Sequence, residues 1–447
     1  MSRFLKGTII LLIAGFITRI LGFINRIVIA RFIGEEGVGL YMMAFPTLML
    51  IITITQLGLP VAISKRVAEA EAQGDYKKIK KILVVSLAST LVLSLFFTPA
   101  LFFSTPYLSK ILFTDERVYL PLLAITPVIP IVAVSSCLRG YFQGRQNMKP
   151  AAFSQVLEQV VRIAFIAALT KMFLPYGIEF AAAGAMFASI LGELLSLLYL
   201  FVSFKRKKKF KVRKKFFAEL KEGRKTFQEL MRIGLPTLGS RLIGNLSWFL
   251  EPIVVAHSLA LAGVGAVMAT KQYGSLTGLA MPLLFLPSFI TYSLATSLVP
   301  AISEAHSRND MGLIEHRLQQ ALKFVFLTGG LAIIILYVLA EPLMELMYGS
   351  TSGAVFIKIM APFFIFHYFQ SPLQATLQAL DLARAAMINS LIGSFVKLIV
   401  IFALASQPSF GIHGAALGII VGIVSVTVLH FATILKKISF SFFVIDY

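Results

Sequence analysis

The chain has little cysteine and little charge. Its one cysteine, Cys137, excludes an intramolecular disulfide and a metal cluster held by several cysteines. Charged residues make up only 14% of the sequence and apolar residues 57%, which lies outside the range of soluble globular proteins. The composition therefore predicts a membrane protein, in which Cys137 is expected to serve in packing.

Common enzyme motifs are missing as well. The sequence has no GxxxxGK[ST] phosphate-binding loop, and the HExxH, DxD and GxSxG patterns do not occur. No loop on the predicted outer side of the membrane is long enough to form a catalytic domain. These absences argue against an enzyme.

Apolar runs of about twenty residues recur along the whole sequence, and each suits a helix that crosses about 30 Å of hydrocarbon. We therefore predict an all-α polytopic membrane protein with about twelve transmembrane helices. The predicted spans are 8–30, 40–63, 82–104, 118–137, 152–173, 181–204, 231–257, 273–300, 320–340, 354–372, 385–405 and 411–434.

Basic residues outnumber acidic ones by 41 to 21, and they alternate by loop. Thirty of them lie on the side that holds the N-terminus, with 139–149 counted as one such loop, six lie on the opposite side and five within spans. This alternation argues against nucleic acid as a partner. By the positive-inside rule, both termini are expected to be cytoplasmic.

The second half of the chain repeats the first in degenerate form. Arg162 and Lys397 stand 235 positions apart, and the segments 177–184 and 411–418 match in nearly the same register. Two halves of about six spans each have the same orientation, which predicts two pseudo-symmetric six-helix lobes with the substrate site near the midplane between them. The predicted parts are an N-terminal lobe over 1–204, a basic cytoplasmic linker over 205–230 and a C-terminal lobe over 231–447. The linker can also bind the anionic head groups of membrane lipids.

Two arginines interrupt the first apolar run. Arg19 and Arg26 are seven residues apart, so both guanidinium groups face the same side of a helix. A charge at that depth costs roughly 2.5–3.5 kcal/mol on insertion scales, so it faces a wet cavity or a partner. Two cations on one stripe favour an anionic substrate, and the alternative is a structural pair or snorkelling to the surface. Arg241 of the seventh span echoes Arg19 in the repeat.

Other spans carry polar stripes. Glu158 and Arg162 can pair at a spacing of four residues, either as a buried ion pair that fixes helix packing or as part of a cavity lining. Lys397 has no carboxylate in its own span, which favours a functional role. Glu251, followed directly by a proline, is a candidate partner for the first-span arginines or a proton or cation site.

Four segments carry a resemblance to known proteins. They are Arg-Ile-Leu-Gly-Phe-Ile-Asn-Arg (19–26), Gly-Val-Gly-Leu-Tyr (37–41), Pro-Val-Ala-Ile-Ser-Lys (60–65) and Leu-Val-Pro-Ala-Ile-Ser-Glu-Ala (298–305). Together they resemble the multidrug/oligosaccharidyl-lipid/polysaccharide flippase superfamily. Within it they look like the polysaccharide-transporter branch, and most like the stage V sporulation protein B group of endospore-forming bacteria.

The resemblance implies two six-helix lobes around a central cavity. It also implies a monomeric transporter that moves an undecaprenyl-diphosphate-linked saccharide across the bacterial cytoplasmic membrane by alternating access. The saccharide would be a peptidoglycan, spore-cortex or polysaccharide precursor. First-span arginines of related lipid II flippases contact the diphosphate, and Arg19 and Arg26 match them. Lys271 loosely resembles an eighth-span arginine of those proteins. No cofactor is implied beyond a possible coupling ion, Na⁺ or H⁺.

The sequence thus predicts a diphosphate site made of Arg19, Arg26 and Arg241. The further substrate-binding candidates are Glu251, Glu158, Arg162, Lys397 and Lys271. Two alternatives stay open. One is a cation-coupled drug exporter of the same superfamily, in which Glu251 would be central. The other is a non-transporting scaffold that recruits envelope-synthesis enzymes through the basic linker.

Overall fold

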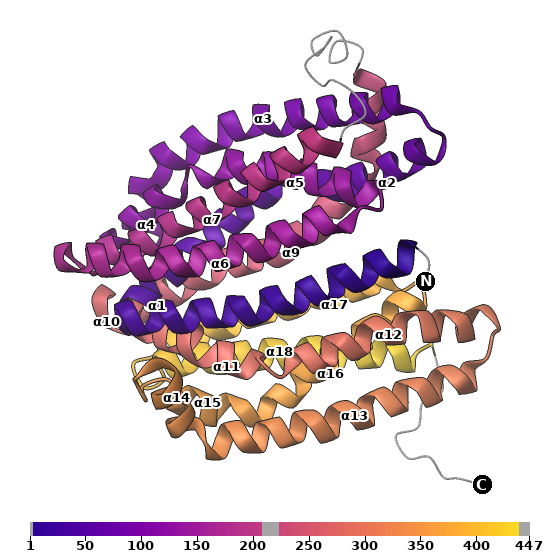
Figure 1. Cartoon of the computed structure of the whole chain (residues 1–447). Helices are drawn as coiled ribbons and strands as arrows, with labels where there is room; N and C mark the ends of the chain where they lie inside the picture. The colour runs from indigo at the N-terminus through magenta and orange to yellow at the C-terminus, as the bar shows by residue number, and fades with distance from the viewer. Residues whose placement is uncertain (1–2, 208–222, 438–447) are drawn as a thin grey trace. The chain divides into compact units, whose positions relative to one another are not determined.

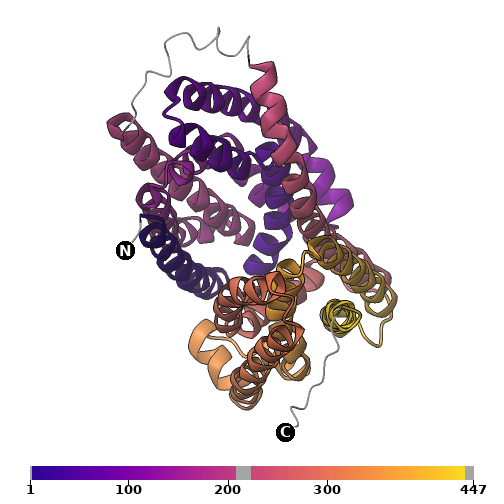
Figure 2. The same cartoon turned by 90° about the vertical axis from the view of Figure 1, so that its right-hand side faces the viewer.

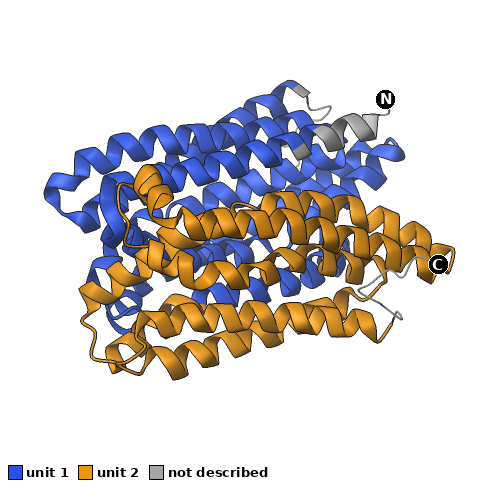
Figure 3. Cartoon of the chain, turned by 90° about the horizontal axis from the view of Figure 1, so that it is seen from below, with its two compact units in different colours: residues 1–249 blue, residues 250–447 orange. Residues whose placement is uncertain are grey.

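A computed structural model describes residues 3–207 and 223–437, which form helices and turns without a strand (Figure 1). Helices suit a chain in lipid, because each one satisfies its backbone hydrogen bonds within itself. The chain divides into two compact units, residues 1–249 and 250–447, which Figure 3 colours separately. Many of the long helices within each unit run side by side, as the nearly end-on view of Figure 2 shows.

The first unit holds the N-terminal helices and most of α9. Its elements are α1 (Arg3–Gln56), α2 (Leu59–Ala72), α3 (Tyr76–Tyr107), η1 (Leu108–Leu112), η2 (Glu116–Val118), α4 (Tyr119–Ile125), α5 (Val128–Gly144), α6 (Met148–Phe173), η3 (Leu174–Tyr176), α7 (Ile178–Lys207) and α9 (Arg224–Leu261).

The second unit begins within α9 and continues through the C-terminal helices. Its further elements are α10 (Ala266–Tyr273), η4 (Gly274–Ala280), α11 (Met281–Phe285), α12 (Ser288–Ser307), α13 (Met311–Val338), α14 (Ala340–Tyr348), α15 (Ala354–Met360), η5 (Ala361–Phe363), α16 (Phe364–Ala379), α17 (Ala383–Ala405) and α18 (Ile412–Leu435). The lobe boundaries predicted at 204 and 231 stay a prediction, because the division by contacts falls inside α9.

The number of membrane crossings depends on how broken helices are counted. The described residues contain 9 helices long and apolar enough to span a membrane, or up to 11 if each of two bent pairs is one span. One of the 9 is the 60-residue stretch Ile13–Ala72, which as a straight helix would measure about 90 Å and is too long for a single crossing. Its backbone leaves the helical conformation at Gly34, between the first two predicted spans. The count of twelve stays a prediction.

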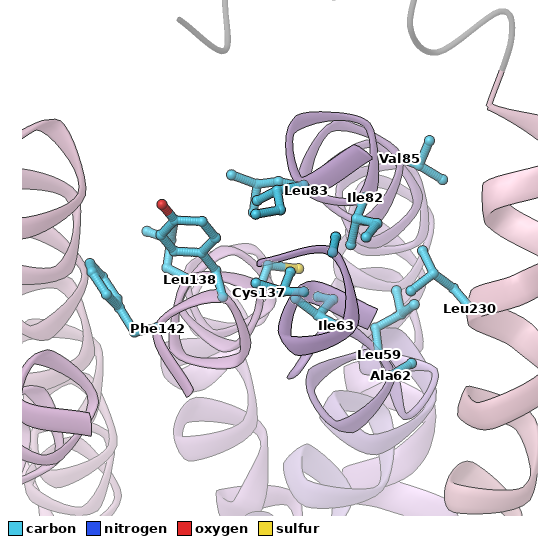
Figure 4. Close-up of a cluster of buried hydrophobic side chains, with 14 of the residues drawn as sticks. Leu59, Ala62, Ile63, Ile82, Leu83, Val85, Cys137, Leu138, Phe142 and Leu230 are labelled. Atoms are coloured by element: carbon cyan, nitrogen blue, oxygen red, sulfur yellow. The ribbon is translucent and has the colours of Figure 1, made fainter. Parts of the chain in front are cut away.

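A core of buried apolar side chains holds the first unit together near the ends of α2, α3 and α5 (Figure 4). Leu59, Ile63 and Phe142 are at most 1% exposed there. Cys137 is fully buried in the same cluster, with its Sγ 3.6 Å from Thr90 Oγ1. The expectation that this thiol serves in packing is confirmed.

The internal repeat recurs in the local structure of the turns. Asp75 caps α3 by accepting a hydrogen bond from the backbone N–H of Lys78 at 2.9 Å, and Asp310 caps α13 by accepting from Leu313 at the same distance. The turn that follows α5 has a residue with positive φ at 146, and the turn that follows α16 has one at 381. Each of these pairs is 235 positions apart, so the two units are built on one pattern.

Gly58, at the start of α2, has to be glycine for two reasons. Its φ is +65°, and a Cβ added there would lie 2.3 Å from the carbonyl oxygen of Gly234 on α9. We expect Gly58→Ala to lower the free energy of unfolding by about 1 kcal/mol for the backbone and about 1–3 kcal/mol more for the overlap. Thermal unfolding of the purified protein would measure the loss.

Gly74 offers a matched control for that substitution. Its φ is +69°, but an added Cβ would meet nothing within 4 Å. Gly74→Ala should therefore lose only the backbone contribution of about 1 kcal/mol. Equal losses at the two glycines would contradict the close approach of α9 to the start of α2.

Candidate functional site

The helix α1 carries both arginines of the first apolar run. Arg19 is exposed and Arg26 is half-buried, while Asn25 is buried. Seven residues correspond to about 10 Å along a helix, so the two guanidinium groups lie two turns apart on one side. Both belong to the apolar stretch Ile13–Ala72, where a charge facing lipid would cost several kcal/mol. The exposure of Arg19 therefore favours a water-filled space or an anionic ligand beside it.

Arg241 is exposed on α9, one turn before Asn245. The amide of Asn245 donates a hydrogen bond to Thr53 Oγ1 on α1 at 2.5 Å. This bond holds the stretch of α9 that carries Arg241 against the second half of α1. That Arg241 shares one ligand with the two arginines of α1 stays a prediction.

Arg139 of α5 is the centre of a buried ion network in the first unit. Its Nη2 donates to Glu158 of α6 at 3.1 Å and to Glu193 of α7 at 3.1 Å. The same nitrogen donates to Ser196 at 2.9 Å, and Arg162 forms a second ion pair with Glu158. Two cations and two carboxylates thus neutralise one another, which makes their burial tolerable.

This network confirms one expectation and corrects another. Glu158 and Arg162 form the predicted pair. Arg139 does not lie in a loop, because α5 runs to Gly144, beyond the end of the predicted span at 137, and carries its side chain inward. Glu193 was the sequence feature that could have indicated a buried cation, because it is a carboxylate in a predicted span that has no cation of its own. All four charges are paired, although the buried Nε of Arg162 has no hydrogen-bond partner within the described residues, and contact of Glu158 and Arg162 with substrate stays a prediction.

A second buried ion pair lies in the second unit. Nζ of Lys397, on α17, donates to Oε2 of Glu251 on α9 at 2.7 Å. Buried Tyr273 of α10 also interacts with Glu251. Glu251 thus has a cation partner other than Arg19 and Arg26, and its pairing with either of those two arginines stays a prediction. Spacing within one span could not reveal the partner, since the carboxylate comes from a different helix.

The two buried ion sites lie at equivalent positions of the internal repeat, 234 or 235 residues apart. Corresponding residues are Arg162 and Lys397, Ser154 and Asn389, and Ser196 and His430. The residues that correspond to Arg139, Glu158 and Glu193 are the uncharged Gln374, Gly393 and Thr427. Asn389 instead donates a hydrogen bond to Thr433 at 2.9 Å and lies 3.3 Å from Nδ1 of His430. In the second unit the cation at this position of the repeat, Lys397, thus pairs with Glu251, a carboxylate on a different helix.

Two further predicted features have less structural support. Lys271 is exposed on α10, and its role in substrate binding stays a prediction. Most of the predicted basic linker falls on residues 208–222, outside the described residues. Its flanks are the end of α7 and the start of α9.

Known proteins resemble the chain along its whole length. Residues 4–306 match the family described as polysaccharide biosynthesis protein, and residues 255–403 match the MatE family. Stage V sporulation protein B of Bacillus subtilis (strain 168) is 63% identical over 446 residues, which cover 100% of this chain and 86% of the relative. Lipid II flippase MurJ of the same organism is 26% identical over 423 residues, covering 89% of this chain and 76% of the relative.

A solved structure shares the fold. An inward-facing multidrug resistance MATE family transporter of the MOP superfamily superposes with a TM-score of 0.80 at 17% identity, covering 94% of each chain. Two of these similar proteins are named as a flippase and a transporter, not as enzymes, and the apolar helices make this chain a multi-pass membrane protein. The chain belongs to the polysaccharide biosynthesis protein family, and it shares its fold with a transporter of the MOP superfamily.

Proposed function

We propose that this chain moves an undecaprenyl-diphosphate-linked saccharide to the outer leaflet of the bacterial cytoplasmic membrane by alternating access. The observation that carries the proposal is the pair of arginines on one side of α1, with Arg19 exposed inside an apolar stretch. Arginine suits a diphosphate because its planar fork forms bidentate, charge-assisted hydrogen bonds to phosphate oxygens. In this proposal Arg19, Arg26 and Arg241 bind the diphosphate, and the transporter acts as a monomer with both termini cytoplasmic.

The relatives support this choice of substrate. Lipid II flippase is the name of the relative that is 26% identical, and stage V sporulation protein B is 63% identical. A peptidoglycan, spore-cortex or polysaccharide precursor fits both names. Drug export driven by a cation receives less support, because the carboxylate that would be central to it, Glu251, is neutralised by Lys397.

The test is the exposure of the lipid-linked precursor on the outer leaflet of cells that lack redundant flippases. We expect Arg19→Ala and Arg26→Ala, each at matched expression, to lower exposure by about tenfold or more, because hydrogen bonds to charged groups contribute about 1.5–3 kcal/mol. Arg19→Lys should retain part of the activity, because lysine keeps the positive charge but cannot form the bidentate hydrogen bonds of a guanidinium group.

Arg308→Ala serves as the control for these variants. Arg308 follows α12, and its side chain is 69% exposed in a pair with Glu304. Its removal should leave exposure of the precursor unchanged. Full activity of Arg19→Ala and Arg26→Ala would contradict the assigned site and would favour a scaffold or a drug exporter.

A further inference from the structure

A cavity of about 240 Å³ lies within the second unit, between α12 and α16. The two helices pack against each other, as Figure 1 shows. The lining includes Tyr292, Thr296, Val299, Ser371, Gln374 and Gln378. No charged side chain belongs to this lining, so the cavity differs in kind from the two buried ion sites.

The polar groups of the cavity form one stripe on α16. Ser371, Gln374 and Gln378 follow one another at spacings of three and four residues, which places them on one face of the helix. The opposite face of α16 is buried, with Leu373 and Leu377 in an apolar core. The amides of Gln374 and Gln378 are exposed, whereas most exposed large side chains of the neighbouring membrane helices are apolar.

The side-chain amides of Gln374 and Gln378 have donors and acceptors that no group in the described part of the chain uses. Elsewhere on α16 the polar groups are used: Gln370 donates to the carbonyl oxygen of Ile423 at 3.0 Å, and Thr376 donates to that of Pro372 at 2.9 Å. Within the described residues, the side chains of Gln374 and Gln378 have no such partner. Gln374 and Gln378 lie beyond the predicted end of this span at 372 but within the last turns of the apolar stretch Ala354–Ala379, where exposed amides favour water or a polar ligand over lipid tails.

The internal repeat explains why the amide of Gln374 has no partner among the described residues of the second unit. Gln374 corresponds to Arg139 of the first unit, where Glu158 and Glu193 neutralise the guanidinium. The second unit has Gly393 and Thr427 at the positions of those carboxylates. The position that is locked in an ion network in one unit therefore presents an uncharged amide to a cavity in the other.

We infer that the cavity between α12 and α16 binds the saccharide of the lipid-linked substrate. Amides and hydroxyls both donate and accept, which matches the hydroxyl groups of a sugar better than a phosphate, whose oxygens favour cations. Tyr292, 49% exposed, adds an aromatic side chain to this lining, as sites for small ligands commonly have. This inference rests on the proposed function and names the part of the protein that recognises the sugar.

The test compares two lipids on the full-length protein in nanodiscs: undecaprenyl diphosphate alone and undecaprenyl diphosphate carrying a disaccharide. Wild type should bind the disaccharide lipid more tightly. Gln374→Ala and Gln378→Ala should each weaken binding of that lipid about three- to tenfold, the effect of one hydrogen bond. Binding of the bare diphosphate should change less than twofold, and this also reports that the variants are folded.

Two more variants sharpen the result. Gln374→Asn keeps the amide but shortens the side chain by one methylene, so it should fall between wild type and Gln374→Ala. Gln320→Ala removes an exposed amide from α13, outside the cavity, and should bind both lipids as wild type does.

The outcomes separate this inference from the proposed function. If wild type binds neither lipid, the proposed function fails and the inference fails with it. If wild type binds both lipids equally, or if the alanine variants keep the preference for the disaccharide lipid, the saccharide site is wrong while diphosphate binding stands.

Discussion

Replacing Arg139 by methionine should lower the free energy of unfolding by about 3–5 kcal/mol, the usual result of breaking a buried ion pair by removing one partner. The substitution keeps much of the side-chain volume but leaves Glu193 buried without its cation, beside the carboxylate of Glu158. Thermal unfolding of the purified protein, together with its yield from membranes, measures the loss.

A second substitution, at Glu193, distinguishes whether the stability lost in Arg139→Met has an electrostatic cause or comes from a packing defect. In the double variant Arg139→Met/Glu193→Gln, Glu158 keeps Arg162 as its partner and the uncompensated charge is gone. Most of the lost stability should therefore return. Arg308→Met, at an exposed pair, should change stability by less than about 1 kcal/mol. An Arg139→Met protein as stable as wild type would contradict the buried network.

Breaking the pair between Glu251 and Lys397 should have a comparable effect. Glu251→Gln and Lys397→Met each leave one buried charge behind, and each should destabilise the protein by about 3–5 kcal/mol. The double variant removes both charges and should recover to within about 1–2 kcal/mol of wild type. The non-additivity in this double-mutant cycle is the measurement that checks the pair.

The same three variants distinguish packing from transport. If the pair only fixes the helices, the double variant should expose the lipid-linked precursor on the outer leaflet as well as wild type does. A double variant that is stable but inactive would show that one of the two charges takes part in transport. Additive losses of stability would contradict the contact itself.

Local pattern predicted those parts of the molecule that depend on nearby residues. Run length predicted helices, and the four-residue spacing of Glu158 and Arg162 predicted their ion pair, because both signals lie within one element. The register between the halves was also readable, since the caps at Asp75 and Asp310 obey the same spacing as the sequence repeat.

Contacts between distant helices could not be predicted in the same way. Glu251 and Lys397 lie on different helices, and nothing in the spacing of either span identifies its partner. Arg139 was misassigned because the end of an apolar run is not the end of a helix, and α5 continues to Gly144. Gln374 and Gln378 are harder to single out from the sequence than charged residues, because uncharged amides are common in helices, although their spacing with Ser371 marks a polar face.

The order in which these charges leave the ribosome differs between the units. Glu158 follows Arg139 after 19 residues and Glu193 follows after 54, so at about 5–20 residues per second the cation of α5 gains its partners within about ten seconds. Lys397 follows Glu251 only after 146 residues, which takes about 7–30 seconds. The carboxylate of α9 therefore has to wait until the fourth following predicted span, 385–405, is made before it can meet its cation, which leaves it open to misassembly for longer than the charges of the first unit.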